Sequence, residues 1–308
     1  MKVTVTGATG ALGSAVVGAL RARGEEVTAL SRDPRRAREK LGAEVRALEW
    51  RHPKAEAPPA EALSSQDALV HLLGEPVAQR WSEQAKREIR DSRVLSTRNL
   101  VTALGELGDG QRPSVLVSQS ATGLYGPRGD EPVDESTPPA GDFLAAVCAE
   151  WEAEARGAEE LGLRVARTRT GVVFSEQGGA LEKMLPAFKL GIGGPVAGGR
   201  QYVPWIHSDD VLGALLFCLD NPGASGPVNV CAPEPVTNAE LSKALGRVLG
   251  RPAIAPVPGL ALRALYGEMA SIVTTGVRAV PRRLEELGYR FRQPDLERAL
   301  TAATGKGD

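Results

Sequence analysis

The chain has 308 residues, of which 37 are basic and 38 acidic. Its net charge of −1 excludes the strong positive field typical of a protein that binds nucleic acid or an anionic membrane. Apolar residues make up 42% and charged residues 24%, which excludes a wholly disordered chain. Three widely spaced cysteines without a CxxC pair argue against a disulfide scaffold or a zinc site, and we expect no metal.

The first residues, MKVTVTG, have the pattern of a strand and carry no basic and apolar leader. No window approaches 18 uninterrupted apolar residues, so we expect no membrane-spanning segment. These two observations predict a cytoplasmic protein.

Strand-type and helix-type segments alternate over about the first 175 residues. Strands are predicted at residues 3–5, 26–30, 43–48, 67–73, 114–117 and 163–167. Helices are predicted at residues 14–23, 34–41, from the cap Ser82 to about 107, and at 151–161. This alternation predicts an α/β fold: a doubly wound parallel sheet of the Rossmann type with helices on both faces.

Glycine and proline crowd residues 178–179 and 191–199, and further helices are predicted at 238–249 and 260–269. We expect a dinucleotide-binding domain over residues 1–175, to which 206–230 returns. Residues 176–205 and 231–308 would form a smaller substrate-binding lobe.

A glycine motif, Gly7-x-x-Gly10-x-x-Gly13, lies between the first predicted strand and the first helix. Glycines allow a tight turn and a close approach of backbone amides to a pyrophosphate, and the helix N-terminus adds partial positive charge. The alternative is a purely architectural glycine-rich turn. The residues expected to contact the cofactor here are Gly7, Thr9, Gly10, Ala11, Leu12 and Gly13.

The GxxGxxG spacing resembles that of the short-chain dehydrogenases/reductases, and residues 6–13, 120–126 and 205–211 are similar to segments of their extended, epimerase/dehydratase-like members. A narrower resemblance, to the branch usually called epimerase family proteins, covers essentially the whole chain. It rests on GEPV at 74–77, RW at 80–81, residues 86–93, 143–152, 191–195 and 198–201, and a tail at 258–300 that resembles a domain of unknown function. The resemblance implies that Leu72, Leu73, Glu88, Arg93 and Val173 lie near the cofactor, and the alternative for Glu88 and Arg93 is a surface pair on the long helix.

The choice between NAD and NADP depends on the end of the second predicted strand, where Ser31 and Arg32 occupy the position that meets the adenosine ribose. An arginine pairs with a 2′-phosphate, whereas a carboxylate would accept bonds from the ribose hydroxyls. We therefore expect NADP (NADPH), while Asp33 leaves NAD open and a solvated basic loop is the structural alternative.

The chain lacks the YxxxK motif that exchanges the proton in ordinary members of this superfamily, and Leu144 and Cys148 occupy the two positions. Ser120 matches the serine position. Tyr125, five residues on, is either a substitute proton donor or a structural residue, with no cation evident to lower its pKa. Cys148 is more consistent with a small buried side chain than with a nucleophile.

Gln201, Trp205 and His207 are predicted to lie at the substrate, with His207 either an acid/base or bonded locally to a neighbouring aspartate. Two hypotheses follow. The first is an NADP-dependent oxidoreductase or epimerase-like enzyme with non-standard proton chemistry at Ser120 and Tyr125. The second is a nucleotide-binding regulatory or scaffold protein without turnover. Either would be a monomer or homodimer that binds an unknown small molecule and neither nucleic acid nor membrane.

Overall fold

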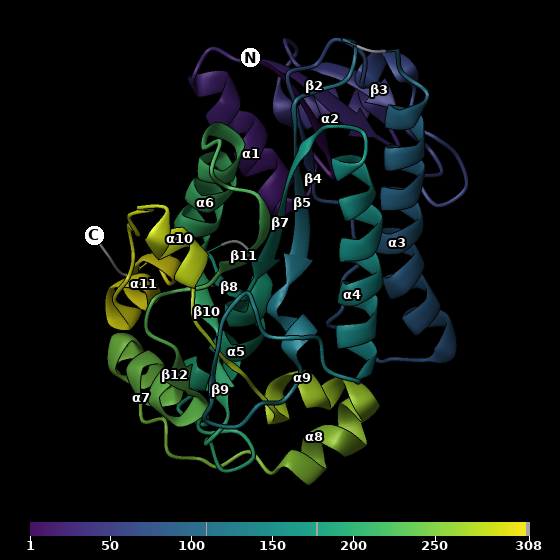
Figure 1. Cartoon of the computed structure of the whole chain (residues 1–308). Coiled ribbons are helices and arrows are strands. Elements are labelled where there is room, and N and C mark those ends of the chain that lie inside the picture. Colours follow the sequence, from purple (N-terminus) through teal and green to yellow (C-terminus); the bar gives the residue numbers. More distant parts are fainter. Residues whose placement is uncertain (109, 177, 306–308) are drawn as a thin grey trace.

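A seven-stranded parallel sheet forms the centre of the computed structural model, which describes residues 1–108, 110–176 and 178–305 (Figure 1). The strand order is β11-β7-β5-β4-β1-β2-β3. The strands are β1 (Lys2–Thr6), β2 (Glu26–Ser31), β3 (Arg46–Glu49), β4 (Ala68–His71), β5 (Val115–Ala121), β7 (Arg164–Thr170) and β11 (Gly226–Val230). This order confirms the doubly wound fold. The sheet reverses its winding between β1 and β4, where such folds bind their ligands.

Helices cover both faces of this sheet. Core cluster contacts place α1 (Ala11–Ala22), α2 (Pro34–Leu41) and α6 (Ser208–Asp220) on one face. The other face carries α3 (Glu83–Gly105) and α4 (Phe143–Arg156). Because both faces are covered, the central strands are apolar on both sides, as Val5 and Leu69 illustrate.

Side-chain caps fix where the two long helices begin. Ser82 accepts a hydrogen bond from the backbone N of Ala85 at 3.1 Å, which confirms the predicted cap of α3. Asp142 caps α4 in the same way through Ala145, so this helix begins at Phe143. The sequence-based start at residue 151 was therefore eight residues late.

The remaining elements are short and lie mostly toward the lower part of Figure 1. Two-stranded pairs join β8 (Val172–Phe174) with β10 (Trp205–His207), β9 (Tyr202–Val203) with β12 (Val236–Thr237), and β6 (Pro132–Val133) with β13 (Arg278–Ala279). The helices are α5 (Gly179–Lys189), α7 (Asn238–Leu249), α8 (Gly259–Tyr266), α9 (Ser271–Thr274), α10 (Arg282–Glu286) and α11 (Leu296–Ala303). Single 3₁₀ turns are η1 (Ala60–Ala62), η2 (Thr122–Tyr125), η3 (Gly157–Glu159) and η4 (Gly267–Ala270). None of the helices in the described ranges is both long and apolar enough to cross a bilayer.

Candidate functional site

The glycine loop at the end of β1 leaves space that side chains would fill. Gly7 has a φ of +64°, and a Cβ there would lie 2.8 Å from the carbonyl oxygen of Leu72. A Cβ on Gly13 would collide with the carbonyl oxygen of Gly7. Gly10, the exposed N-cap of α1, has no side chain to bond the first amides of the helix. These amides are free to meet an anion, as a pyrophosphate requires.

The neighbours of this loop include several of the predicted cofactor residues. Leu72 and Leu73, which follow β4, pack against Gly7. The ammonium of Lys40 on α2 donates to the carbonyl oxygen of Thr9 at 2.8 Å, which brings positive charge to the loop. Ala11 and Leu12 open α1 beside it.

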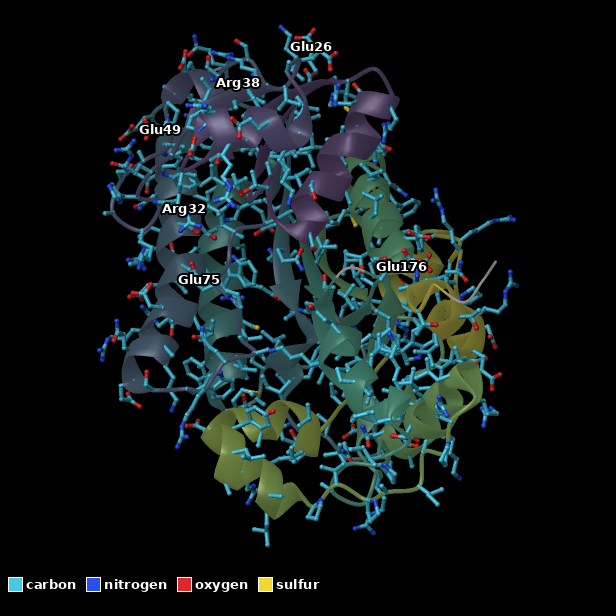
Figure 2. All side chains as sticks on the ribbon, turned by 180° about the vertical axis from the view of Figure 1, so that it is seen from behind. Glu26, Arg32, Arg38, Glu49, Glu75 and Glu176 are labelled. Atoms are coloured by element: carbon cyan, nitrogen blue, oxygen red, sulfur yellow. The ribbon has the colours of Figure 1, made fainter. Side chains whose placement is uncertain are left out.

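At the end of β2, Arg32 and Asp33 differ in whether their charged groups already have partners. Asp33 accepts from the backbone N of Arg36 at 3.0 Å and so caps α2, while the hydroxyl of Ser31 bonds the backbone of Asp33. Arg32, labelled in Figure 2, is exposed. Within the described ranges its side chain makes no hydrogen bond or ion pair. The guanidinium of Arg32 is therefore available to a ligand. The carboxylate of Asp33, which would favour NAD, already accepts a hydrogen bond from the backbone of α2.

Glu88 and Arg93 do not pair with each other. Glu88 forms an ion pair with Lys54 at 2.5 Å on the surface. Arg93 points inward, donates to the carbonyl oxygens of Ile89 and Glu75 at 2.9 Å, and lies over the Trp151 ring, 5.3 Å from its centroid. Burial lowers the pKa of Arg93. Val173 lies in β8, beside Ile206 of β10.

Ser120 and Tyr125 belong to one buried polar network. The Ser120 hydroxyl donates to Oε1 of Glu152 at 2.7 Å, and Arg169 binds both oxygens of that carboxylate at 2.8 and 2.9 Å. Nη1 of Arg169 also donates to the Tyr125 hydroxyl at 2.9 Å. That hydroxyl donates in turn to Oδ1 of Asn229 at 2.6 Å. The network thus joins β5, α4, β7 and β11.

This network argues against Tyr125 as the substitute proton donor. Its side chain is fully buried and its hydroxyl already donates one hydrogen bond and accepts another. Burial raises the pKa of Tyr125, although the adjacent Arg169 opposes the shift. Sequence reasoning missed this cation, since an arginine on a strand carries no local motif. A structural role for Tyr125 explains these contacts.

Leu144 and Cys148, at the positions of the usual tyrosine and lysine, are not suited to proton transfer. Leu144 on α4 packs beside Gly123 and has no ionisable group. Burial raises the pKa of Cys148, one helical turn further on, to about 12. The thiol stays protonated at neutral pH and lies in an apolar cluster with Leu124 and Val133.

The predicted substrate residues are engaged within the protein. Trp205 is 1% exposed, stacks on Phe174 at 5.8 Å between centroids, and donates its indole N–H to the carbonyl oxygen of Glu234. Gln201 donates to the carbonyl oxygens of Val196 and Val273. These contacts occupy the indole N–H of Trp205 and the amide nitrogen of Gln201, and the placement of both residues at a substrate stays a prediction.

His207 is the N-cap of α6. Its Nδ1 accepts from the backbone N of Asp209 at 3.2 Å and lies 3.6 Å from the carboxylate of that residue. The ring is 5% exposed. The local bond to an aspartate, one of the two predicted alternatives, is the arrangement found.

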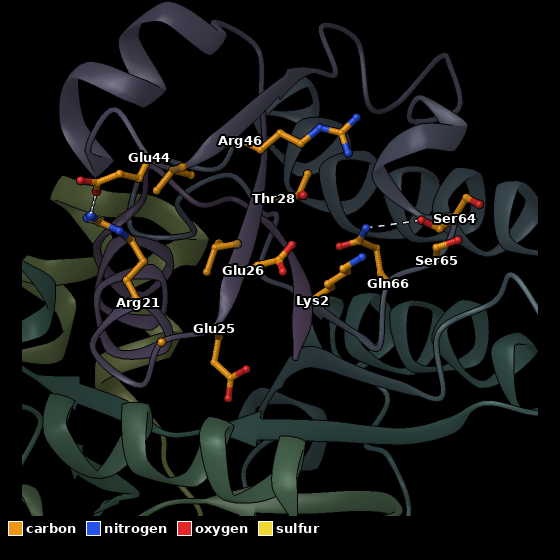
Figure 3. A pocket seen from close by; sticks show the side chains of 13 residues that line it. Lys2, Arg21, Glu25, Glu26, Thr28, Glu44, Arg46, Ser64, Ser65 and Gln66 are labelled. Atoms are coloured by element: carbon orange, nitrogen blue, oxygen red, sulfur yellow. Dashed lines mark hydrogen bonds and ion pairs between the residues drawn. The ribbon is translucent and has the colours of Figure 1, made fainter.

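A separate hollow of about 550 Å³ lies at the opposite end of the sheet, around the amino ends of β1 and β2 (Figure 3). Lys2, Glu26 and Gln66 line it, and Arg21 forms an ion pair with Glu44 at its rim. Since nucleotide sites of this fold lie at the carboxyl ends of the strands, this hollow is not the dinucleotide site. Among the described side chains, no group of three or more His, Cys, Asp or Glu could hold a metal ion.

The strand order and the glycine loop together define a dinucleotide-binding protein of the Rossmann class. The chain belongs to the NAD dependent epimerase/dehydratase family, whose model matches residues 3–231. Residues 257–303 match a domain of unknown function, DUF1731. Both matches confirm the resemblance noted in the sequence.

Several relatives carry names of the same branch. The chain is 40% identical over 304 residues to the epimerase family protein Mb2239 of Mycobacterium bovis, covering 98% of this chain and 97% of that one. The SDR39U1 homolog of Arabidopsis thaliana, named chloroplastic, is 38% identical over 98% of this chain and 86% of its own. The crystal structure of human SDR39U1 with NADPH is 34% identical and superposes with a TM-score of 0.86 over 99% of both chains.

Proposed function

We propose that this protein binds NADP(H) and acts as a cytoplasmic oxidoreductase or epimerase-like enzyme on a small molecule. The observation that carries the choice of cofactor is the exposed guanidinium of Arg32, which has no hydrogen-bond or ion-pair partner among the described residues, beside an Asp33 whose carboxylate caps α2. The 2′-phosphate of NADP(H) would pair with this guanidinium. The NADPH in the human relative's structure supports the same cofactor.

The glycine loop would hold the pyrophosphate through the first amides of α1, and Leu72 and Leu73 would border the ribose. When bound, the nicotinamide supplies the hydride chemistry. Ser120 is the proposed catalytic hydroxyl. Ser120 is 1% exposed and already donates to Glu152, so it would act on a bound substrate as a hydrogen-bond acceptor that orients a substrate hydroxyl.

Calorimetric titration with NADPH and with NADH tests the cofactor. We expect NADPH to bind much more tightly, and Arg32→Ala to weaken NADPH by at least about tenfold while leaving NADH unchanged, since one charge-assisted contact contributes about 1.5–3 kcal/mol. Arg290→Ala, at another exposed arginine, is the matched control. If neither cofactor binds, the glycine loop is architectural and the proposal fails.

A second candidate function is a cofactor-binding protein without turnover. Leu144 has no ionisable group, and Cys148 and Tyr125 are buried, with the Tyr125 hydroxyl already bonded to Asn229; these observations favour it. NADPH oxidation against a panel of carbonyl compounds tests for an oxidoreductase, and product analysis of each compound after incubation with the cofactor tests for an epimerase, which regenerates its cofactor. Turnover that Ser120→Ala abolishes supports the enzyme, whereas NADPH binding without turnover across the panel supports the second function. A monomeric or homodimeric state and the lack of nucleic-acid partners remain predictions.

A further inference from the structure

Exposed large apolar side chains concentrate in one part of the molecule. Among the described residues, eight large hydrophobic side chains are exposed, and only Met1 lies outside residues 190–273. The others include Ile254 at 82%, Leu260 at 80% and Leu190 at 75% exposure. Single exposed hydrophobics are ordinary, but a group confined to one region marks an interaction surface.

Helix α8 directs its apolar face outward. Leu260, Ala261, Ala264 and Leu265 share one side of the helix at spacings of one, four and five residues, and all four are exposed. No residue of α8 is buried. A surface helix of a soluble protein ordinarily packs its apolar stripe against the core, so this face is left for a partner.

Backbone hydrogen bonds join α8 to the other exposed residues in one surface. The N–H of Val257 donates to Pro195 and that of Ala197 to Val257, both at 2.9 Å, so that residues 193–197 run beside 255–257. A Cβ on Gly259 would lie 3.2 Å from Ala197. We call residues 189–200 and 251–266 the lower-edge surface, because α8 and the connector before it form the lower edge of Figure 1.

The lower-edge surface is entirely basic in its charge. It contains four basic residues and no Asp or Glu: Lys189, Arg200, Arg251 and Arg263. All four are exposed, and none of their side chains makes a hydrogen bond or ion pair with any described residue. The rest of the chain carries 33 basic against 38 acidic residues. The net charge of −1 therefore conceals a local excess of four positive charges.

The basic charge of the lower-edge surface indicates which kind of partner could bind there. A second copy of the chain in a two-fold dimer would place this basic surface against itself and repel. An anionic lipid headgroup attracts the cations, while the acyl boundary accepts Leu, Ile and Tyr side chains individually and needs no complementary groove. Tyr266, 45% exposed at the end of α8, suits the headgroup level.

We propose that the lower-edge surface docks the protein on membranes that carry anionic headgroups. Arg251 and Arg263 meet the headgroups, and Leu260 and Leu265 enter the boundary beneath them. The protein binds peripherally, and binding is independent of its cofactor. The proposal departs from the expectation of no membrane partner, which rested on the near-neutral net charge and on the lack of a long apolar segment.

The test is co-sedimentation of the full chain with vesicles of phosphatidylcholine, alone or mixed with phosphatidylglycerol. We expect binding to the mixed vesicles only, and weaker binding at high salt. The double variant L260S/L265S should abolish binding, and R251E/R263E should reduce the partition at least about tenfold. Arg35→Glu, an exposed charge reversal on α2, is the matched control. Because these sites are exposed, thermal melting should not change.

Three outcomes would overturn the proposal. The intact chain could bind neither vesicle, or L260S/L265S could bind as well as the intact chain. Alternatively, light scattering could show a dimer that L260S/L265S dissociates, which would make a second copy the occupant.

Discussion

Gly13 is the residue at which the backbone of the cofactor loop is most sensitive to a side chain. A methyl group there would overlap the carbonyl oxygen of Gly7, so Gly13→Ala must displace α1 from the loop. We expect a loss of about 2 kcal/mol in the free energy of unfolding and no measurable NADPH binding, by urea unfolding and calorimetry. Gly18→Ala on the same helix meets nothing within 4 Å and should stabilise by up to about 1 kcal/mol. Equal effects at both positions would contradict this account.

Substitution of Tyr125 tests whether the buried network serves stability or catalysis. Tyr125→Phe removes the bonds to Asn229 and Arg169 and should cost about 1–3 kcal/mol of unfolding free energy. NADPH affinity should not change, because the hydroxyl lies inside the protein. If stability were unaffected while any NADPH turnover disappeared, Tyr125 would be the proton donor after all.

At the residue scale, sequence reasoning predicted the glycine loop but not the intramolecular contacts of Trp205 and Gln201. The glycine motif is local, so its strand, turn and helix could be predicted. Which surface of Trp205 or Gln201 is free depends on Phe174, Val196 and Val273, and no spacing rule encodes those contacts. Arg169 was missed for the same reason.

At the scale of elements, β4 is joined to its neighbours through a buried histidine. Nδ1 of His71 bonds the hydroxyl of Thr6 on β1 at 2.8 Å, and Nε2 bonds that of Thr97 on α3 at 2.9 Å. The Thr97 hydroxyl donates to the carbonyl oxygen of Arg93, so it accepts from Nε2 and the ring carries its proton there. Burial lowers the pKa of His71 to about 3.

This pKa predicts a loss of stability in acid. In the unfolded chain His71 is protonated below its ordinary pKa of 6.5, whereas in the folded protein the ring stays neutral down to about pH 3. The free energy of unfolding therefore falls as the pH drops from 6.5 toward 3. Between pH 7.5 and 5 the His71 contribution to this loss is about 2 kcal/mol. Urea unfolding at both pH values should show a smaller loss in His71→Gln. An unchanged pH dependence would contradict the prediction.

The elements themselves were largely predictable where hydrophobic periodicity and caps agree. The predicted helices at 34–41 and 238–249 match α2 and α7 residue for residue. The predicted start of α4 was too late because the prediction took no account of Asp142 as an N-cap. Asp142 itself, three residues before Ala145, was the available signal.

At the scale of the whole molecule, Glu135 connects the sheet to the C-terminal segment. Its Oε1 accepts from the backbone N of Asn229 on β11 at 2.8 Å and from that of Arg283 on α10 at 3.1 Å. Asn229 also donates to the carbonyl oxygen of Val280 and receives the Tyr125 hydroxyl. One hydrogen-bond network, buried at Tyr125 and Asn229, therefore spans the sheet and the residues that follow it, which predicts that both unfold together.

Calorimetry of the intact chain should then show a single unfolding transition. NADPH at about 100 times its dissociation constant should add about 2.7 kcal/mol to the free energy of unfolding and move the whole transition to higher temperature. Glu135→Ala leaves the amide of buried Asn229 and that of half-buried Arg283 without an acceptor, and should cost about 2–4 kcal/mol and split or broaden the transition. Glu135→Gln keeps an acceptor oxygen and should be milder. Two transitions in the unmodified protein, with only one shifted by NADPH, would show that the C-terminal segment folds independently of the sheet.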